Sequence, residues 1–140
     1  MKNGFEVVND VRALINVQPV LGLITGAIYP GQRPSNSTKS DIVVRTNGGT
    51  NSQDQAFYVY INCYYPSISS TIDGKLQSLP DYAKLSTLAK AIEPLVDSQF
   101  KATFRCWVDE TANLVQDSDG SFFISIRVRY QSIQENYKNI

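Results

Sequence analysis

The chain has 140 residues, 42% of them hydrophobic and 11% aromatic, which suffices for a single domain over residues 1–140 with one core. Thirteen basic and thirteen acidic residues cancel, so no overall charge attracts nucleic acid or an anionic membrane. Histidine is absent, which removes the commonest general base and most catalytic zinc sites.

The first part of the chain predicts a helix followed by a short strand. Apolar residues recur at helical spacing over residues 4–16, and Pro19 ends this helix. Residues 26–29 are predicted as the first strand. Residues 30–40 are rich in turn-forming residues and have no periodicity, so they are expected to form a loop.

A hairpin is predicted next. Residues 41–46 are rich in β-branched residues and predict a strand. Residues 47–54 are polar and contain two glycines, so they are expected to be a wide loop joining that strand to residues 55–65. The loop opens a strand and no Lys-Ser pair follows it, which argues against a phosphate-binding loop.

The strand over residues 55–65 carries four of the eight tyrosines and no charge. Side chains alternate between the two faces of a strand, so Phe57, Val59, Ile61 and Cys63 form a core face. The opposite face then carries aromatic rings tipped with hydroxyl groups, which suits a surface that another protein covers. Its members are Tyr58, Tyr60, Asn62 and Tyr64.

Residues 66–80 are expected to form a long connection with a tight turn at Asp73-Gly74. It contains Ile68, Ile72 and Leu76, which are more apolar residues than a freely solvated loop carries. Two interpretations stay open: a loop folded against its own core, or an arm that lies on a neighbouring subunit.

The last third predicts a helix and a hairpin. Apolar spacing over residues 82–96 indicates the second helix, with a capping box at residues 78–81 and a kink or interruption at Pro94. Strands are expected at about residues 101–110 and 121–131, joined by a turn at residues 117–120. The expected fold class is α+β: one mostly antiparallel sheet of four to five strands with two helices packed on one face, in the order α-β-β-β-α-β-β.

The closing hairpin extends the aromatic face. Trp107, Arg127 and Arg129 alternate with apolar residues, so they are expected beside Tyr58 and Tyr60. Tyr, Trp and Arg are the residues enriched at the centres of protein interfaces. We rank a protein interface first and an ordinary solvated face second. Stacking of single-stranded nucleic acid comes third, because the net charge is zero and no RNA-recognition signature is present.

The chain resembles the tail-completion and tail-terminator proteins of tailed phages, which join head to tail. The resemblance lies in the element order, the Gly26-Ala-Ile-Tyr-Pro30 segment, the proline-containing loop and the Ile42-Val-Val44 strand. The resemblance covers about residues 5–131 and depends on order and length, because this family has no catalytic signature. It implies a structural virion protein, made in the host bacterial cytoplasm, that forms a ring at the neck or tail end around the DNA channel.

The partners implied are further copies of the chain, in a ring of six or twelve subunits, and the neighbouring connector or tail proteins, with DNA only as passing cargo. Candidate contact residues are the aromatic and arginine side chains of the sheet face and the apolar residues of the 66–80 connection: Tyr58, Tyr60, Tyr64, Ile68, Ile72, Leu76, Trp107, Arg127 and Arg129.

No catalytic, cofactor-binding or metal-binding residue is predicted, and neither a membrane nor a small-molecule substrate is expected as a partner. The chain offers no nucleophile with a base, and the acids at 117 and 119 lie in a turn without the rest of a calcium loop. Cys63 and Cys106 are expected to be buried, reduced thiols. The competing functional class is a monomeric or small-oligomer adaptor that binds through its aromatic sheet face.

Overall fold

The computed structural model describes residues 2–50 and 55–133, and part of the predicted 47–54 loop lies outside them. The helices are α1 (Gly4–Ile15), α2 (Gln18–Leu21) and α3 (Tyr82–Val96). The strands are β1 (Ile28–Pro30), β2 (Asp41–Gly49), β3 (Ala56–Tyr64), β4 (Ile68–Ile72), β5 (Lys75–Leu79), β6 (Gln99–Phe100), β7 (Phe104–Gln116) and β8 (Phe122–Ser132).

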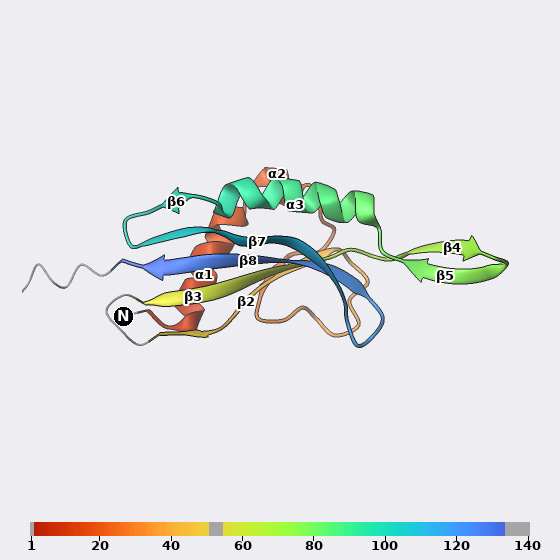
Figure 1. The fold of residues 1–140 in the computed structure, drawn as a ribbon, viewed down its shortest axis with the longest axis horizontal. Coiled ribbons are helices and arrows are strands. Elements are labelled where there is room, and N and C mark those ends of the chain that lie inside the picture. The colour runs from red at the N-terminus through yellow and green to blue at the C-terminus, as the bar shows by residue number, and fades with distance from the viewer. Residues whose placement is uncertain (1, 51–54, 134–140) are drawn as a thin grey trace, which may run out of the picture.

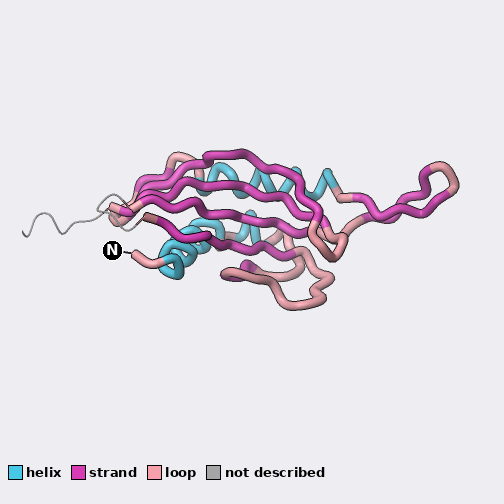
Figure 2. Tube along the Cα trace, turned by 60° about the horizontal axis from the view of Figure 1, so that its bottom comes forward, coloured by secondary structure: helices cyan, strands magenta, loops and turns pink. Residues whose placement is uncertain are grey.

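A curled sheet in the order β1-β2-β3-β8-β7-β6 forms the body of the molecule, and the helices lie against one of its faces (Figure 1). All neighbouring strands of this sheet are antiparallel except β1 and β2, which run parallel. The second sheet is the hairpin β4-β5, which stands outside the body (Figures 1 and 2). The α+β class is therefore confirmed.

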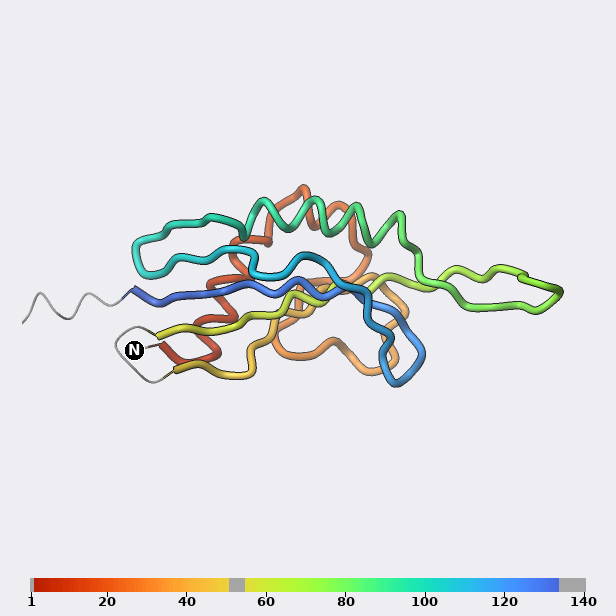
Figure 3. The backbone as a smooth tube through the Cα atoms, in the orientation of Figure 1, coloured from red at the N-terminus to blue at the C-terminus, as the bar shows by residue number. Residues whose placement is uncertain are grey.

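The predicted sheet of four to five strands and the count of two helices were wrong. Within the described residues the main sheet has six strands, and α2 adds a third helix. The additional elements are short: β6 has two residues, and α2 has four, with Pro19 in its first turn. Elements of this length are shorter than the periodicity from which strands and helices are recognised. The tube in Figure 3 follows this path through the body.

Residues 66–80 form a hairpin rather than an irregular loop. Asp73 and Gly74 both have positive φ angles, of 51° and 78°, as a two-residue type I′ turn requires. The strands that flank this turn are polar and exposed, so they lack the alternation of a half-buried strand. The predicted tight turn is confirmed, whereas the strands beside it were missed.

The ends of the helices follow local capping chemistry. Asn3 accepts from the backbone N–H of Glu6 at 3.0 Å, and the Glu6 carboxylate accepts from the N–H of Asn3, which is a capping box. Asp81 caps α3, so the predicted box beginning at Ser78 was wrong. Helix α3 continues through Pro94 to Val96 without interruption, because the proline lies within its last turn.

The core lies between the helices and the inner sheet face. The residues predicted for the core face of the tyrosine strand, Phe57, Val59, Ile61 and Cys63, are all buried, and they pack with further buried side chains: Ile42, Val44, Leu88, Ile92, Ile124 and Ile126. Strands β3 and β8 occupy the centre of the sheet and pair along their whole length, from Ala56 opposite Gln131 to Tyr64 opposite Phe123. The face assignment of the tyrosine strand is therefore confirmed.

A polar cluster fastens the start of the chain to this core. The Lys2 ammonium group lies 2.7 Å from Asp10 and donates to the hydroxyl of Tyr130, while the backbone N–H of Lys2 donates to Gln55. Burial and the hydrogen bond to Asp10 raise the pKa of Tyr130. Helix α1 is thereby held against the far ends of β3 and β8.

Truncation of a core side chain tests the face assignment. Ile61 is fully buried, so we expect Ile61→Ala to lower the free energy of unfolding by about 2 to 5 kcal/mol in chemical denaturation. The matched control is Ile133→Ala, an exposed isoleucine just after β8, which should change it by less than about 0.5 kcal/mol. Equal effects of the two variants would contradict the assignment.

Thiol chemistry tests the burial of the cysteines. Cys63 and Cys106 are free and buried, and burial raises the pKa of both, that of Cys106 to about 11. Since the thiolate is the reactive form, labelling of the native protein at about pH 8 should be slow and should go to completion only after denaturation. Rapid labelling, or a disulfide-linked species on a non-reducing gel, would refute this.

Candidate functional site

The outer face of the sheet brings together most of the residues that the sequence placed there. In the strand register Tyr58 lies opposite Arg129, and Arg129 lies opposite Trp107. Tyr60 lies opposite Arg127 in the same way. Among the described residues no helix covers this side of β3, β8 and β7, and we call it the open face. Its members are Tyr58, Tyr60, Trp107, Arg127 and Arg129.

Cation–π contacts organise the open face. The guanidinium carbons of Arg127 and Arg129 lie 4.8 and 4.7 Å from the centroid of the Tyr58 ring. Arg105 lies 5.7 Å from the ring of Trp107 in the same manner. Each contact places a guanidinium group within cation–π distance of an aromatic ring. The face is therefore ordered before any partner arrives, which lowers the entropy lost on binding.

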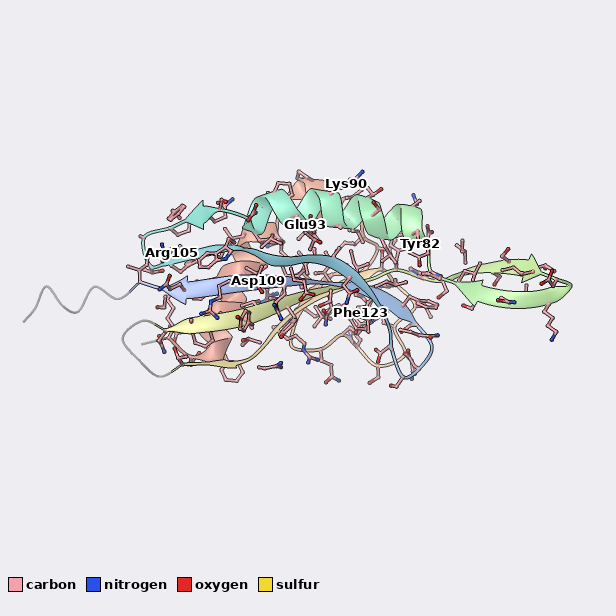
Figure 4. The ribbon with its side chains drawn as sticks, viewed as in Figure 1. Tyr82, Lys90, Glu93, Arg105, Asp109 and Phe123 are labelled. Carbon is pink, nitrogen blue, oxygen red and sulfur yellow. The ribbon has the colours of Figure 1, made fainter. Side chains whose placement is uncertain are left out.

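Carboxylates on β7 neutralise part of the charge of this face. Arg127 lies 2.6 Å from Asp109 and 3.5 Å from Glu110, and the hydrogen bond to Asp109 raises its pKa. Figure 4 labels Asp109 and Arg105, which β7 contributes to the open face. A bulge after Val108 places both Asp109 and Glu110 within reach of Arg127. The positive charge of Arg127 is therefore offset within the face itself.

Tyr64 lies apart from Tyr58 and Tyr60, at the end of β3 that leads into the hairpin β4-β5. Its ring packs against Phe123, with centroids 4.8 Å apart, and Arg33 lies 4.4 Å from its centroid. Tyr64 lies on the same face of β3 as Tyr58 and Tyr60, but its ring contacts Phe123 and Arg33 rather than the arginines of β8. Three residues of β3 lie between Tyr60 and Tyr64, and residues of the loop 31–40 line a pocket beside Tyr64.

A buried carboxylate, missed from the sequence, fixes that loop. Asp41 is fully buried, and its carboxylate lies 3.1 Å from Nε of Arg33 and accepts from Oγ of Ser37 at 2.6 Å. The backbone N–H of Ala27 also donates to it. A Cβ at position 26 would lie 1.7 Å from the Asp41 carboxylate, so Gly26 is required for this approach. A charged residue at the start of a β-branched strand was the available signal.

Loop 31–40 closes over a polar pocket of about 290 Å³ on the outer side of the sheet. Asn62 in its lining is only 7% exposed, and its side-chain oxygen has no hydrogen-bond partner among the described residues. Burial and the nearby Asp117 carboxylate raise the pKa of Tyr64, and hydrogen bonds from Ser121 lower that of Asp119. The pocket is lined by residues 31–37 of the loop and by residues of the sheet and of the β7–β8 turn: Val43, Arg45, Asn62, Tyr64, Asp117 and Asp119.

An apolar groove of about 480 Å³ adjoins this pocket and shares Gly31 and Arg45 with it. Phe5 and Val8 of α1 and Pro30 of β1 line it. Strand β1 pairs with β2 only as far as Val44, so no described strand pairs with the rest of β2 on that side. Phe5 is 83% exposed there.

The hairpin β4-β5, which we call the arm, carries the other predicted contact residues. Ile68, Ile72 and Leu76 are exposed to 47%, 40% and 75%, so the interpretation of a loop packed on its own core was wrong. In the register of the arm Ile68 and Ile72 share a face, whereas Leu76, opposite Thr71, lies on the other face. The three residues therefore do not form a single stripe.

The described residues include no group of three or more Cys, Asp or Glu side chains that could hold a metal ion. Asp109 and Glu110 are engaged by Arg127, and Asp117 and Asp119 lie in the β7–β8 turn with backbone and Ser121 partners. No helix within residues 2–50 and 55–133 has the length and apolar character needed to cross a bilayer.

No protein-family model matches this chain, and no curated protein matches its sequence.

The ion pair beneath the loop gives a direct test of the pocket. Arg33→Ala leaves the buried Asp41 carboxylate without its counter-charge, and we expect the free energy of unfolding to fall by about 3 to 5 kcal/mol. Arg45→Ala, in the same pocket but exposed, is the matched control and should change it by less than about 0.5 kcal/mol. Denaturant titration compares the two, and equal stability would show that Asp41 does not need Arg33.

Proposed function

We propose that this chain is a structural virion protein of a tailed phage, which assembles into a ring at the head–tail neck or the tail end. The observation that carries the proposal is the arm. It projects away from the body with its apolar side chains exposed, in a chain whose core is complete without it. A two-stranded hairpin is at best marginally stable alone, so such an arm needs a surface to lie on.

The open face supports the same conclusion. It presents aromatic rings and arginines that are held by contacts with one another, and these are the residue types that dominate interface energies. The proposal also draws on the resemblance of the sequence to tail-completion and tail-terminator proteins, although α2, β4, β5 and β6 are additions to the element order on which that resemblance was based. In a ring, the open face supplies contacts to adjoining subunits or to the connector and tail proteins above and below.

The chain is suited to surround DNA without holding it. Its formal net charge is zero, and Asp109 and Glu110 offset Arg127 on the open face. Tight DNA binding requires many unpaired cationic contacts to phosphates. A ring of such chains would let DNA pass as cargo.

Ring assembly tests the proposal. Wild-type protein should form rings in negative-stain images and a matching mass in solution. Tyr58 contacts both arginines and is 40% exposed, so Tyr58→Ala should weaken assembly about tenfold or more and leave the circular dichroism unchanged. Lys90→Ala, on the exposed side of α3 (Figure 4), is the control and should assemble as wild type.

Three results would contradict the ring. A strictly monomeric wild type would favour the adaptor function. Assembly unaffected by Tyr58→Ala would remove the open face from the contacts. Strong, salt-sensitive DNA binding that is lost with Arg129→Ala would promote nucleic-acid binding instead.

A further inference from the structure

Most of the apolar residues of the arm lie on one face, which we call its apolar face, and charged residues lie at its tip. Ile68, Ile72 and Leu79 share that face with Ser70, Gln77 and Lys75, because Ile68 pairs with Leu79 and Ile72 pairs with Lys75, whereas Leu76 lies on the other face. Asp73 is the first residue of the turn and Lys75 directly follows it, and neither makes an ion pair within the described residues. Both outer edges of the arm are free of strand partners in the part of the chain that the structure describes.

The groove and pocket together have the complementary pattern. The groove is apolar at Phe5, Val8 and Pro30, and it continues through Arg45 into the polar pocket. Along the groove, β2 beyond Val44 offers a strand edge that β1 leaves unpaired. At the polar end, the buried oxygen of Asn62 accepts no hydrogen bond. A bound strand with a polar tip would satisfy each of these groups.

We propose that the arm of one copy lies in the groove of a second copy, with its edge along β2 and its tip in the polar pocket. This inference rests on the proposed ring and names the surfaces that form it. Ile68 and Ile72 cover the apolar groove, and an N–H group of the tip donates to Asn62. The arm extends a sheet edge in the way that strand-addition interfaces do.

Charge complementarity sets the direction of the arm. Asp117 and Asp119 form no ion pair among the described residues, and Arg45 forms none either. Lys75 reaches the two carboxylates, and Asp73 reaches Arg45. With the tip at the polar end, the apolar face of the arm falls on the apolar part of the groove. The reverse direction would place both charges beside Phe5.

The arm of a chain cannot lie in the groove of the same chain. The arm leaves the body at the end of β3 and points away from it in both views (Figures 1 and 2). The contact therefore joins two different surfaces of two copies. Such head-to-tail contacts produce a closed ring when the rotation between copies closes, and an open filament when it does not.

Crosslinking of two separately purified variants tests the contact. Ser70→Cys places a thiol on the apolar face of the arm, between Ile68 and Ile72, and Asn9→Cys places one on the wall of the groove. The native thiols are buried, so a short bis-maleimide will join only the engineered ones. A mixture of the two variants should give a crosslinked dimer in high yield. Thr71→Cys, on the opposite face of the arm, replaces Ser70→Cys as control and should give several-fold less.

Charge reversal tests the direction. Lys75→Asp and Asp117→Lys should each weaken self-association about tenfold in sedimentation experiments, and the double variant should recover most of the loss. Lys90→Asp, on the surface of α3, carries the same charge change and should have no effect. Circular dichroism confirms that each variant is folded.

The outcomes separate this inference from the proposed ring. Rings in wild type, with neither the Ser70–Asn9 crosslink nor an effect of Lys75→Asp, would overturn the arm contact and leave the ring standing. A specific crosslink without rings would support the arm contact and refute the ring. Equal crosslinking from Ser70 and Thr71 would overturn the assigned face, and single reversals without rescue in the double variant would overturn the assigned direction.

Discussion

A single layer of helices covers a sheet that has two faces, and much of the molecule follows from that constraint. The inner face buries alternate residues of β3 and β8 against α1 and α3. The outer face has no such layer over most of its area in the described residues, and several of its side chains contact one another. Tyr58 holds two arginines over its ring, and Asp109 and Glu110 hold Arg127. An uncovered face with so few free polar groups is well prepared to meet another protein surface.

The end of the sheet near Tyr64 meets the same constraint in a different way. Here the loop 31–40 crosses onto the outer side, and Asp41 anchors it from below. A buried carboxylate needs a counter-charge and hydrogen bonds, and Arg33, Ser37 and the backbone of Ala27 supply them. The loop does not fill the space above Asn62, whose oxygen stays buried without a partner. The pocket is thus a consequence of how the loop is fastened.

Unpaired strand edges are the second constraint on this fold. At its two ends the main sheet has short strands, β1 with three residues and β6 with two, and short edge strands limit uncontrolled pairing. The part of β2 beyond Val44 and both edges of the arm have no strand partner among the described residues and are not shortened in this way. Paired with each other between copies, they would protect one another, which links the shape of the monomer to the assembly that we propose.

The amino-acid sequence was sufficient to predict the core face of the sheet, the two long helices and two of the turns. Alternation fixed the faces of β3 and β8, apolar spacing fixed α1 and α3, and Asp73-Gly74 and residues 117–120 fixed two turns, because each of these signals depends only on near neighbours in the chain. Tertiary structure alone decided the rest. The stacking of Arg127 and Arg129 on Tyr58, the separation of Tyr64 from that cluster, and the burial of Asp41 under Arg33 join residues far apart in sequence. The short edge strands and the projection of the arm from the body depend on which surfaces the other elements leave uncovered. A pattern of neighbouring residues in the sequence does not show which surfaces these are.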